Sequence, residues 1–464
     1  MIKMKPQKLK KNSKKWAIFD MKKNVLLIVI DSLRADKFQG GKKTAITPNI
    51  DKLIKNGFNF SNTISSTDGT YASLASLFTG KNPYSHNVSW FKNHLNTIES
   101  LEIIKKNNIK LFGTVPNQTF FKNISSVFDE IDLVDGQPYL RIFEGLGKKI
   151  LERLDKIKNT APWFYYIHLM DFHISKKLPD EFDKDKFGKT TWDKRLHILD
   201  LWIGKILKKI DLNDTIIIFT ADHGEFDIDL DVDYGSMPKL QNVSKSLSTT
   251  LPNFLGPTGL KLFVFFREQN RKREKRKLEK KLVDKNETRK LCTRSNAPLY
   301  DDVLKIPFLI CTPENFIGSS NQQVRQIDII PTIFDLLGLN IDFPIDGITL
   351  KSILQNISSS ELNAYIESTP DPSTDNEFGT YIGLRTSAFK LIKSRNESQK
   401  NTLLFDLKND PQEQNNIASE KPEIVSEMED LLMKYRTNET NLSIINDQDE
   451  TSKIKEELKK MGYI

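Results

Sequence analysis

The chain has 464 residues, 38% of them hydrophobic and 28% charged, so it can bury a sizeable core and is neither disordered nor fibrous. Its length allows about two to four domains of roughly 150 residues. The net charge of +8 is uneven, because residues 1–23 carry +8 and residues 267–290 carry +7, which leaves −7 on the rest of the chain.

Several classes of protein are excluded by what the chain lacks. No internal repeat suggests a solenoid or propeller. No apolar run approaches the roughly 18 residues that a transmembrane helix needs, and the N-terminus does not resemble a signal peptide. The two cysteines, Cys292 and Cys311, have neither metal-ligand spacing nor a disulfide framework. We therefore expect a cytoplasmic protein without a transmembrane segment, which could also lie at a membrane surface.

The predicted elements alternate between strands and helices. Val25 to Ile30 is a continuous apolar run, as in a strand that is covered on both faces. Further strands are expected at 111–115, 163–167, 215–220, 260–266 and 306–311, and helices at 48–56, 142–158 and 194–209. This alternation predicts an α/β domain with a layered, mostly parallel sheet.

The chain divides into segments of different composition. Residues 1–23 form a basic extension, 24–350 the main domain with an insertion at 236–296, 351–440 a smaller α+β subdomain, and 441–464 a polar tail. The subdomain is predicted from hairpin-like stretches at 380–394 and 402–407 and a helix at 422–434. The basic segments 1–23 and 267–290 could bind anionic lipid or nucleic acid, or 267–290 could be a solvated helical insertion.

Polar residues follow three of the predicted strands. Asp31 ends the first strand, Asp171 and His173 follow the 163–167 strand, and Asp222-His223 follow the 215–220 strand. Functional side chains gather beyond the carboxyl ends of such strands. Asp222-His223-Gly224-Glu225 together with Asp31 could bind a divalent ion. Taken singly, the first motif could be a structural turn, and Asp31 could cap a following turn.

Thr70 begins a stretch of small residues that predicts a tightly packed helix. A hydroxyl at this helix terminus faces unpaired backbone N–H groups, where it could attack an anionic phosphorus or sulfur centre. Thr70 could equally be only the N-cap of the helix.

Taken together and in order, these motifs resemble the sulfatase-like branch of the alkaline phosphatase superfamily. The matching segments are 24–36, 47–53, 70–80, 168–173, 221–225, 299–302, 306–307, 328–339, 346–347, 390–392, 404–407 and 410–413. The agreement extends from about residue 24 to about residue 435.

The resemblance implies a three-layer α/β/α core with a smaller C-terminal α+β subdomain, and metal-assisted ester transfer through a covalent intermediate. It implies that Asp31, Asp222 and His223 hold one divalent ion (Mn, Mg, Zn or Ca), with Thr70 as nucleophile and a further ligand. It places His173 where the family has a histidine that contacts the transferring group or its leaving oxygen.

Three departures from the family pattern affect the expected reaction. Sulfatases carry Pro and Arg two and four residues after a Cys or Ser that becomes formylglycine, whereas Ala72 and Leu74 follow Thr70. Ser32 replaces the second Asp of the usual pair, which weakens a calcium site. Residues 293–296 hold no His of the kind found in relatives, so a second metal site is not expected.

We therefore expect a metal-dependent hydrolase or transferase of phosphate or sulfate esters, with the phosphoester favoured. The ester could be a small molecule or linked to a glycan or lipid. Two alternatives remain: a sulfuric ester hydrolase proper, or an inactive family member that binds an anion, lipid or nucleic acid.

Overall fold

The computed structural model describes residues 23–226 and 299–436, apart from short gaps at 41–42, 90–94, 96–97, 137–138, 161, 174–177, 358–359, 371–380 and 396–401. A nine-stranded sheet lies at the centre, in the order β4-β3-β5-β1-β6-β7-β2-β8, with β9 paired to β2. The strands are β1 (Asn24–Ile30), β2 (Phe58–Ile64), β3 (Lys110–Pro116), β4 (Glu130–Val134), β5 (Trp163–Leu169), β6 (Thr215–Thr220), β7 (Lys305–Cys311), β8 (Gly318–Ser320) and β9 (Val324–Arg325).

The five strands from β4 to β6 run parallel, and β7 is antiparallel to both of its neighbours. β1 lies between β5 and β6, and every residue of these three strands is buried. Continuous apolar runs suit this position, because helices cover both faces of a parallel sheet. The carboxyl ends of β5, β1 and β6 consequently meet at one edge.

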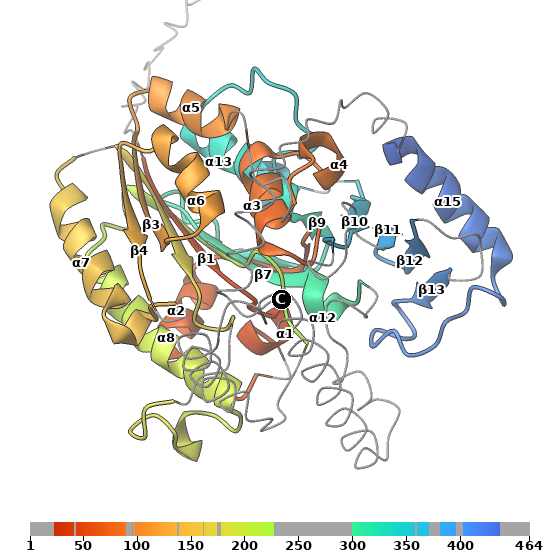
Figure 1. Ribbon diagram of the computed structural model, residues 1–464, viewed down its shortest axis with the longest axis horizontal. Coiled ribbons are helices and arrows are strands. Elements are labelled where there is room, and N and C mark those ends of the chain that lie inside the picture. The colour runs from red at the N-terminus through yellow and green to blue at the C-terminus, as the bar shows by residue number, and fades with distance from the viewer. Residues whose placement is uncertain are drawn as a thin grey trace, which may run out of the picture.

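Helices pack on both faces of the sheet (Figure 1). Apolar residues of α3 (Thr70–Thr79), α5 (Glu99–Lys106), α6 (Thr119–Ile124) and α13 (Ile329–Leu337) share one core with Val25, Leu27 and Val29 of β1. Those of α2 (Pro48–Asn56), α7 (Leu146–Ile157) and α8 (Thr191–Leu207) share the other with Leu26, Ile28 and Ile30. The alternation of β1 side chains between two cores confirms the expected three-layer arrangement.

A separate antiparallel sheet follows, in the order β10-β11-β12-β13. Its strands are β10 (Ala364–Glu367), β11 (Tyr381–Arg385), β12 (Phe389–Ser394) and β13 (Leu403–Asp406), and α15 (Pro422–Arg436) packs against it through Met428 and Leu432. Figure 1 shows this sheet and α15 beside the main domain. Short helices complete the described chain: α1 (Ala35–Phe38), α4 (Pro83–His86), α12 (Asp301–Leu304), α14 (Lys351–Leu354), and the 3-10 turns η1 (Ser125–Val127), η2 (Ile142–Glu144), η3 (Asp185–Phe187) and η6 (Gln326–Asp328).

Two predicted helix boundaries are wrong. The helix expected over 142–158 is divided at Gly145, whose φ of 116° lies in the left-handed region, into η2 and α7. The helix expected from 194 starts at Thr191, because Thr190 and Asp193 form a reciprocal capping box.

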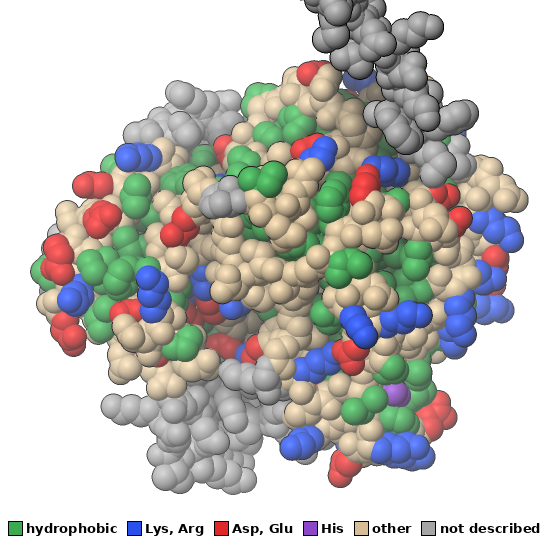
Figure 2. Space-filling model, turned by 180° about the vertical axis from the view of Figure 1, so that it is seen from behind, with side chains coloured by type: hydrophobic (Ala, Val, Ile, Leu, Met, Phe, Trp, Pro, Cys, Tyr) green, Lys and Arg blue, Asp and Glu red, His purple; other side chains and the backbone are tan. Residues whose placement is uncertain are grey.

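Several predictions fall outside the described residues: all of the basic extension 1–23 except residue 23, the strand 260–266, the whole insertion 236–296 with its basic segment, and the tail 441–464. Among the described residues, no helix is both long and apolar enough to cross a membrane. On the face shown in Figure 2, acidic and basic side chains are both spread over the surface.

Candidate active site

The site lies where three adjacent strands end. Asp31 follows β1, His173 lies beyond the end of β5, and Asp222-His223 follow β6. Thr70, at the first turn of α3, faces the same point. The structure thus brings together the five residues predicted as catalytic or metal-ligating. The sheet order places β1 between β5 and β6, which gathers four of them, and α3 brings Thr70.

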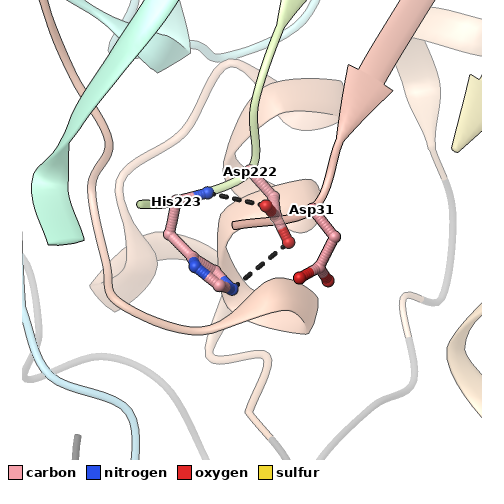
Figure 3. Close-up of side chains that lie close together, drawn as sticks. All are labelled: Asp31, Asp222 and His223. Carbon is pink, nitrogen blue, oxygen red and sulfur yellow. Dashed lines mark hydrogen bonds and ion pairs between the residues drawn. The ribbon is translucent and has the colours of Figure 1, made fainter. Parts of the chain in front are cut away.

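Asp31, Asp222 and His223 form a buried cluster whose potential ligand atoms all lie within 4.8 Å of one another. Figure 3 shows Asp31 at the end of its strand, opposite Asp222 and His223 on the loop after β6. His223 Nε2 lies 3.3 Å from Asp222 Oδ2, and this oxygen has no hydrogen-bond partner in the described part of the chain. Two carboxylates and an imidazole are a donor set that suits a divalent cation.

The electrostatics of the cluster also fit a cation. Burial opposes the ionisation of Asp31, but His173, His168 and His223 together outweigh it and hold the pKa of Asp31 well below its usual value. Burial and the charge of Asp31 raise the pKa of Asp222 well above its usual value. Ionising both of two buried carboxyl groups this close together costs much more free energy than ionising one of them, unless a positive charge lies between them.

Thr70 contacts the cluster directly. Its hydroxyl donates to Asp31 Oδ2 at 3.1 Å, and its Oγ1 lies 3.2 Å from His223 Nε2. The N-cap position of α3 is occupied by Gly69, so Thr70 does not cap the helix. The alternative interpretation of Thr70 as only a helix cap is therefore wrong, since the side chain is used within the site.

His173 and His168 approach Asp31 from the β5 side. His173 Nδ1 donates to Asp31 Oδ1 at 3.0 Å, and the His173 ring packs edge-on against Tyr139. His168 is fully buried; its Nδ1 pairs with the Tyr166 hydroxyl at 2.9 Å, while its Nε2 lies 3.8 Å from Asp31 Oδ2. Asp31 is therefore surrounded by imidazoles, which explains its lowered pKa.

Asp171 lies beside the cluster rather than in it. Its Oδ1 accepts the Ile142 N–H at 3.2 Å, which fastens the segment after Tyr139 to the end of β5. Burial raises the pKa of Asp171 to about 6, partly offset by the Ile142 N–H and by the charges of Arg141 and Arg195. A carboxyl in this environment changes protonation close to neutral pH.

Ser32 links the two carboxylates. Its backbone N–H donates to Asp222 Oδ1 at 3.1 Å, and its hydroxyl donates to Asp31 Oδ1 at 2.6 Å. This geometry requires a φ of 63°, in a region that residues other than Gly, Asn and Asp rarely adopt. The sequence flagged Ser32 only as a missing carboxylate, and its bridging contacts could not be read from it.

A buried polar cluster behind Asp222 was missed by the sequence analysis. Gln326 Nε2 donates to the carbonyls of Ala221 at 3.0 Å and Asp222 at 2.9 Å, and its Oε1 accepts from Ser73 at 2.9 Å. Ser65 also donates to the Asp222 carbonyl, and the Ser73 hydroxyl shares its one proton between that carbonyl and Gln326 Oε1. Ser73 lies one helical turn after Thr70, so this cluster ties the Thr70 helix to the loop that carries Asp222 and His223.

Fold and site define a class of protein: a three-layer α/β domain with a buried Asp-Asp-His cluster at the strand ends and a hydroxyl beside it. The model of the Sulfatase family matches residues 23–339, and the chain belongs to this family. A second model, N-sulphoglucosamine sulphohydrolase, C-terminal, matches residues 296–438. Membership confirms the predicted family.

Curated relatives support the same assignment. An arylsulfatase of Clostridium perfringens is 22% identical over 89% of this chain and 94% of that protein. An N-acetylglucosamine-6-O-sulfatase of Bacteroides thetaiotaomicron is 27% identical over 30% of this chain. The chain spans only 27% of the length of that sulfatase, and 32% of an uncharacterized Haemophilus influenzae protein that it matches at 26% identity.

Solved structures share the fold. A phosphonate monoester hydrolase of Agrobacterium radiobacter superposes with a TM-score of 0.64 at 16% identity, covering 90% of this chain and 96% of that one. A protein solved in complex with its substrate D-glucosamine-2-N,6-O-disulfate superposes with a TM-score of 0.60 at 16% identity, covering 92% and 99%. At these identities the likeness concerns the fold alone.

Proposed function

We propose that this protein is a metal-dependent hydrolase of sulfate or phosphate esters that uses Thr70 as its nucleophile. The observation that carries the proposal is the position of Thr70 Oγ1, 3.1 Å from Asp31 Oδ2 and 3.2 Å from His223 Nε2. Asp31, Asp222 and His223 would hold the divalent ion. When bound, the ion supplies positive charge that polarises the ester and stabilises the alkoxide form of a hydroxyl.

In the proposed reaction, the residues of the site form a covalent intermediate on Thr70, and water then hydrolyses it. The Thr70 oxygen forms a bond to sulfur or phosphorus while the bond to the leaving oxygen breaks. The Thr70 proton, oriented by its hydrogen bond to Asp31 Oδ2, passes to a water molecule, because the low pKa of Asp31 makes that carboxylate a poor base. His173, held by Asp31 through Nδ1, gives a proton to the leaving oxygen from its other nitrogen. Water then attacks the sulfo- or phospho-threonine, which releases the inorganic anion and restores Thr70.

The two possible esters are favoured by different observations. Family membership and the names of the relatives support a sulfate ester, and a sulfated sugar is the substrate class that those names suggest. The unmodified Thr70, followed by Ala72 and Leu74, lacks the formylglycine pattern and favours a phosphoester. We propose that the one site hydrolyses both esters. Competition between an aryl sulfate and an aryl phosphate measures which ester it prefers.

Replacement of the nucleophile tests the proposal. In protein loaded with Mn²⁺, Thr70→Ala should abolish turnover of 4-nitrophenyl sulfate and 4-nitrophenyl phosphate, whereas Thr70→Ser should retain a measurable rate. Metal content, measured on the same samples, shows whether the ion is still bound. Full activity of Thr70→Ala would overturn the role of Thr70. A wild-type protein that binds metal and turns over neither ester would instead favour a binding protein.

A further inference from the structure

The small C-terminal sheet reaches the loop in front of Thr70. At the last residue of β10, Glu367 N–H donates to the Ser66 carbonyl at 3.0 Å, and Glu367 forms a parallel bridge with Thr67. Two residues later, the backbone N–H and the hydroxyl of Thr369 both donate to Asp68 Oδ1, at 2.7 and 2.9 Å. Residues 367 and 369 of the C-terminal sheet segment thus contact residues 66–68, and residue 68 lies two positions before Thr70.

Gly69, next to Thr70, shows how close this contact is. A β-carbon built on Gly69 would lie 2.3 Å from Thr369 Cγ2 and 2.9 Å from Thr369 Oγ1. The backbone of Gly69 is extended, with φ −134° and ψ 143°, so any residue could adopt its conformation. Glycine is therefore required at this position by the proximity of Thr369 and not by the conformation of the chain.

Gly69 also connects this contact to the helix. It is the N-cap residue of α3, and its carbonyl accepts the Ser73 N–H at 3.0 Å. Any displacement of Gly69 therefore moves the first turn of α3, and with it the Thr70 hydroxyl. Asp31 and His223 follow β1 and β6 at the centre of the sheet, and Ser73 is tied to the Asp222 carbonyl. A shift of Gly69 would therefore be taken up in the first turn of α3 and would move Thr70 Oγ1 relative to Asp31 and His223.

We propose that Thr369 of the C-terminal subdomain is a positioning residue for the nucleophile: by holding Asp68 and fitting against Gly69, it fixes the distance from Thr70 Oγ1 to Asp31 and His223. This inference rests on the proposed function of Thr70. A displacement of about 1 Å at a reacting group can cost on the order of 100-fold in rate. The C-terminal subdomain thereby helps to position the nucleophile.

A set of variants of the full chain tests the contact. Gly69→Ala should lower kcat by about 100-fold through the overlap with Thr369, with Mn²⁺ affinity within about twofold of wild type, because the ligand residues stay in place. Adding Thr369→Ala removes Cγ2 and Oγ1 and should restore kcat to the level of Thr369→Ala alone. Adding Thr369→Val instead keeps the bulk and should leave Gly69→Ala slow.

Gly147→Ala serves as the matched control. A β-carbon on Gly147 would lie 2.3 Å from Trp202 Cε3, an equal overlap located on α7. This variant should show a lowered unfolding temperature with kcat unchanged. If it slows the reaction as much as Gly69→Ala does, the effect at Gly69 is general destabilisation and the proposal is overturned.

Two further outcomes separate this inference from the proposed function. Thermal unfolding of the Gly69→Ala and Thr369→Ala single and double variants measures the contact without any substrate, and strict additivity of their shifts would refute it. Failure of Thr369→Ala to restore kcat in an active wild-type background would refute the positioning role. If the wild-type protein is inactive but the unfolding shifts of the two variants are not additive, the contact between Gly69 and Thr369 is real. Both the proposed enzyme activity and the positioning role would then be refuted.

Discussion

Two clusters of charged residues in this molecule differ in how far nearby cations compensate their carboxylates. At the strand ends, Asp31 and Asp222 lie in one buried cluster, and the pKa of Asp222 is raised by burial and by Asp31. At α12, Asp301 is half-buried, with 16% of its side chain exposed; Arg385 Nη2 lies 2.7 Å from its Oδ2 and Lys390 Nζ contacts its Oδ1. Burial opposes the ionisation of Asp301, but these cations outweigh it and lower its pKa.

The difference teaches how to tell a binding site from a structural ion pair. The Asp301 cluster is completed by protein cations, since Lys390 also contacts Glu413, and it joins the start of α12 to the C-terminal sheet. In the Asp31 cluster, imidazoles compensate Asp31, whereas the pKa of Asp222 stays raised, so this cluster fits an external cation. A buried carboxylate without enough positive partners is costly, so its retention favours a functional role.

The largest expected effect comes from breaking the uncompensated cluster. Asp222→Asn should lower Mn²⁺ affinity by more than about 100-fold, since changes outside the ligand set already cost 10- to 100-fold at metal sites. The metal-free variant should be at least as stable as wild type, because it no longer buries that carboxylate. Isothermal titration calorimetry and thermal unfolding measure the two quantities, with Asp211→Asn on the surface as control. A metal-free variant that is clearly less stable would contradict our account of the cluster.

Breaking the compensated cluster should have the opposite signature. Asp301→Asn leaves Arg385 and Lys390 without their shared carboxylate and should lower the free energy of unfolding by about 3 to 5 kcal/mol. Mn²⁺ affinity of the folded protein should be unchanged. Urea unfolding with and without Mn²⁺ gives both values. Loss of metal affinity without loss of stability would show that the two clusters are not separate in function.

A smaller effect, on stability, is expected from a change at Asp171, which lies beside the Asp31 cluster. Its pKa is about 6 in the folded protein against a usual 3.8, so its favourable contribution is fully present below about pH 3.8 and is lost as the pH rises through about 6. At pH 7 Asp171→Asn should therefore be more stable than wild type, by at most about 3 kcal/mol. Unfolding of both proteins from pH 4 to pH 8 measures this difference. A difference that does not vary with pH would contradict the raised pKa.

Much of the site could be predicted from local sequence. Apolar runs such as 25–30 and 215–220 indicated buried strands, and the acidic and histidine residues directly after them indicated the edge where a site would form. Strand β2 was missed because its sequence, FNFSNTI, mixes polar residues into the run. Gly145 and the capping box at Thr190 moved helix ends, because these depend on single residues rather than on periodicity.

By itself, the sequence determined the α/β alternation, the residues that follow each strand, and the family to which the chain belongs. Only the tertiary structure decided that β5, β1 and β6 are neighbours, that Gln326 supports Asp222, and that Thr369 contacts Asp68 across 301 positions of sequence. The physical reason is that apolar runs and the periodicity of helices and strands involve residues close together in the chain, so they leave a local pattern in the sequence. Contacts between distant segments depend on strand order and packing, which no local pattern records.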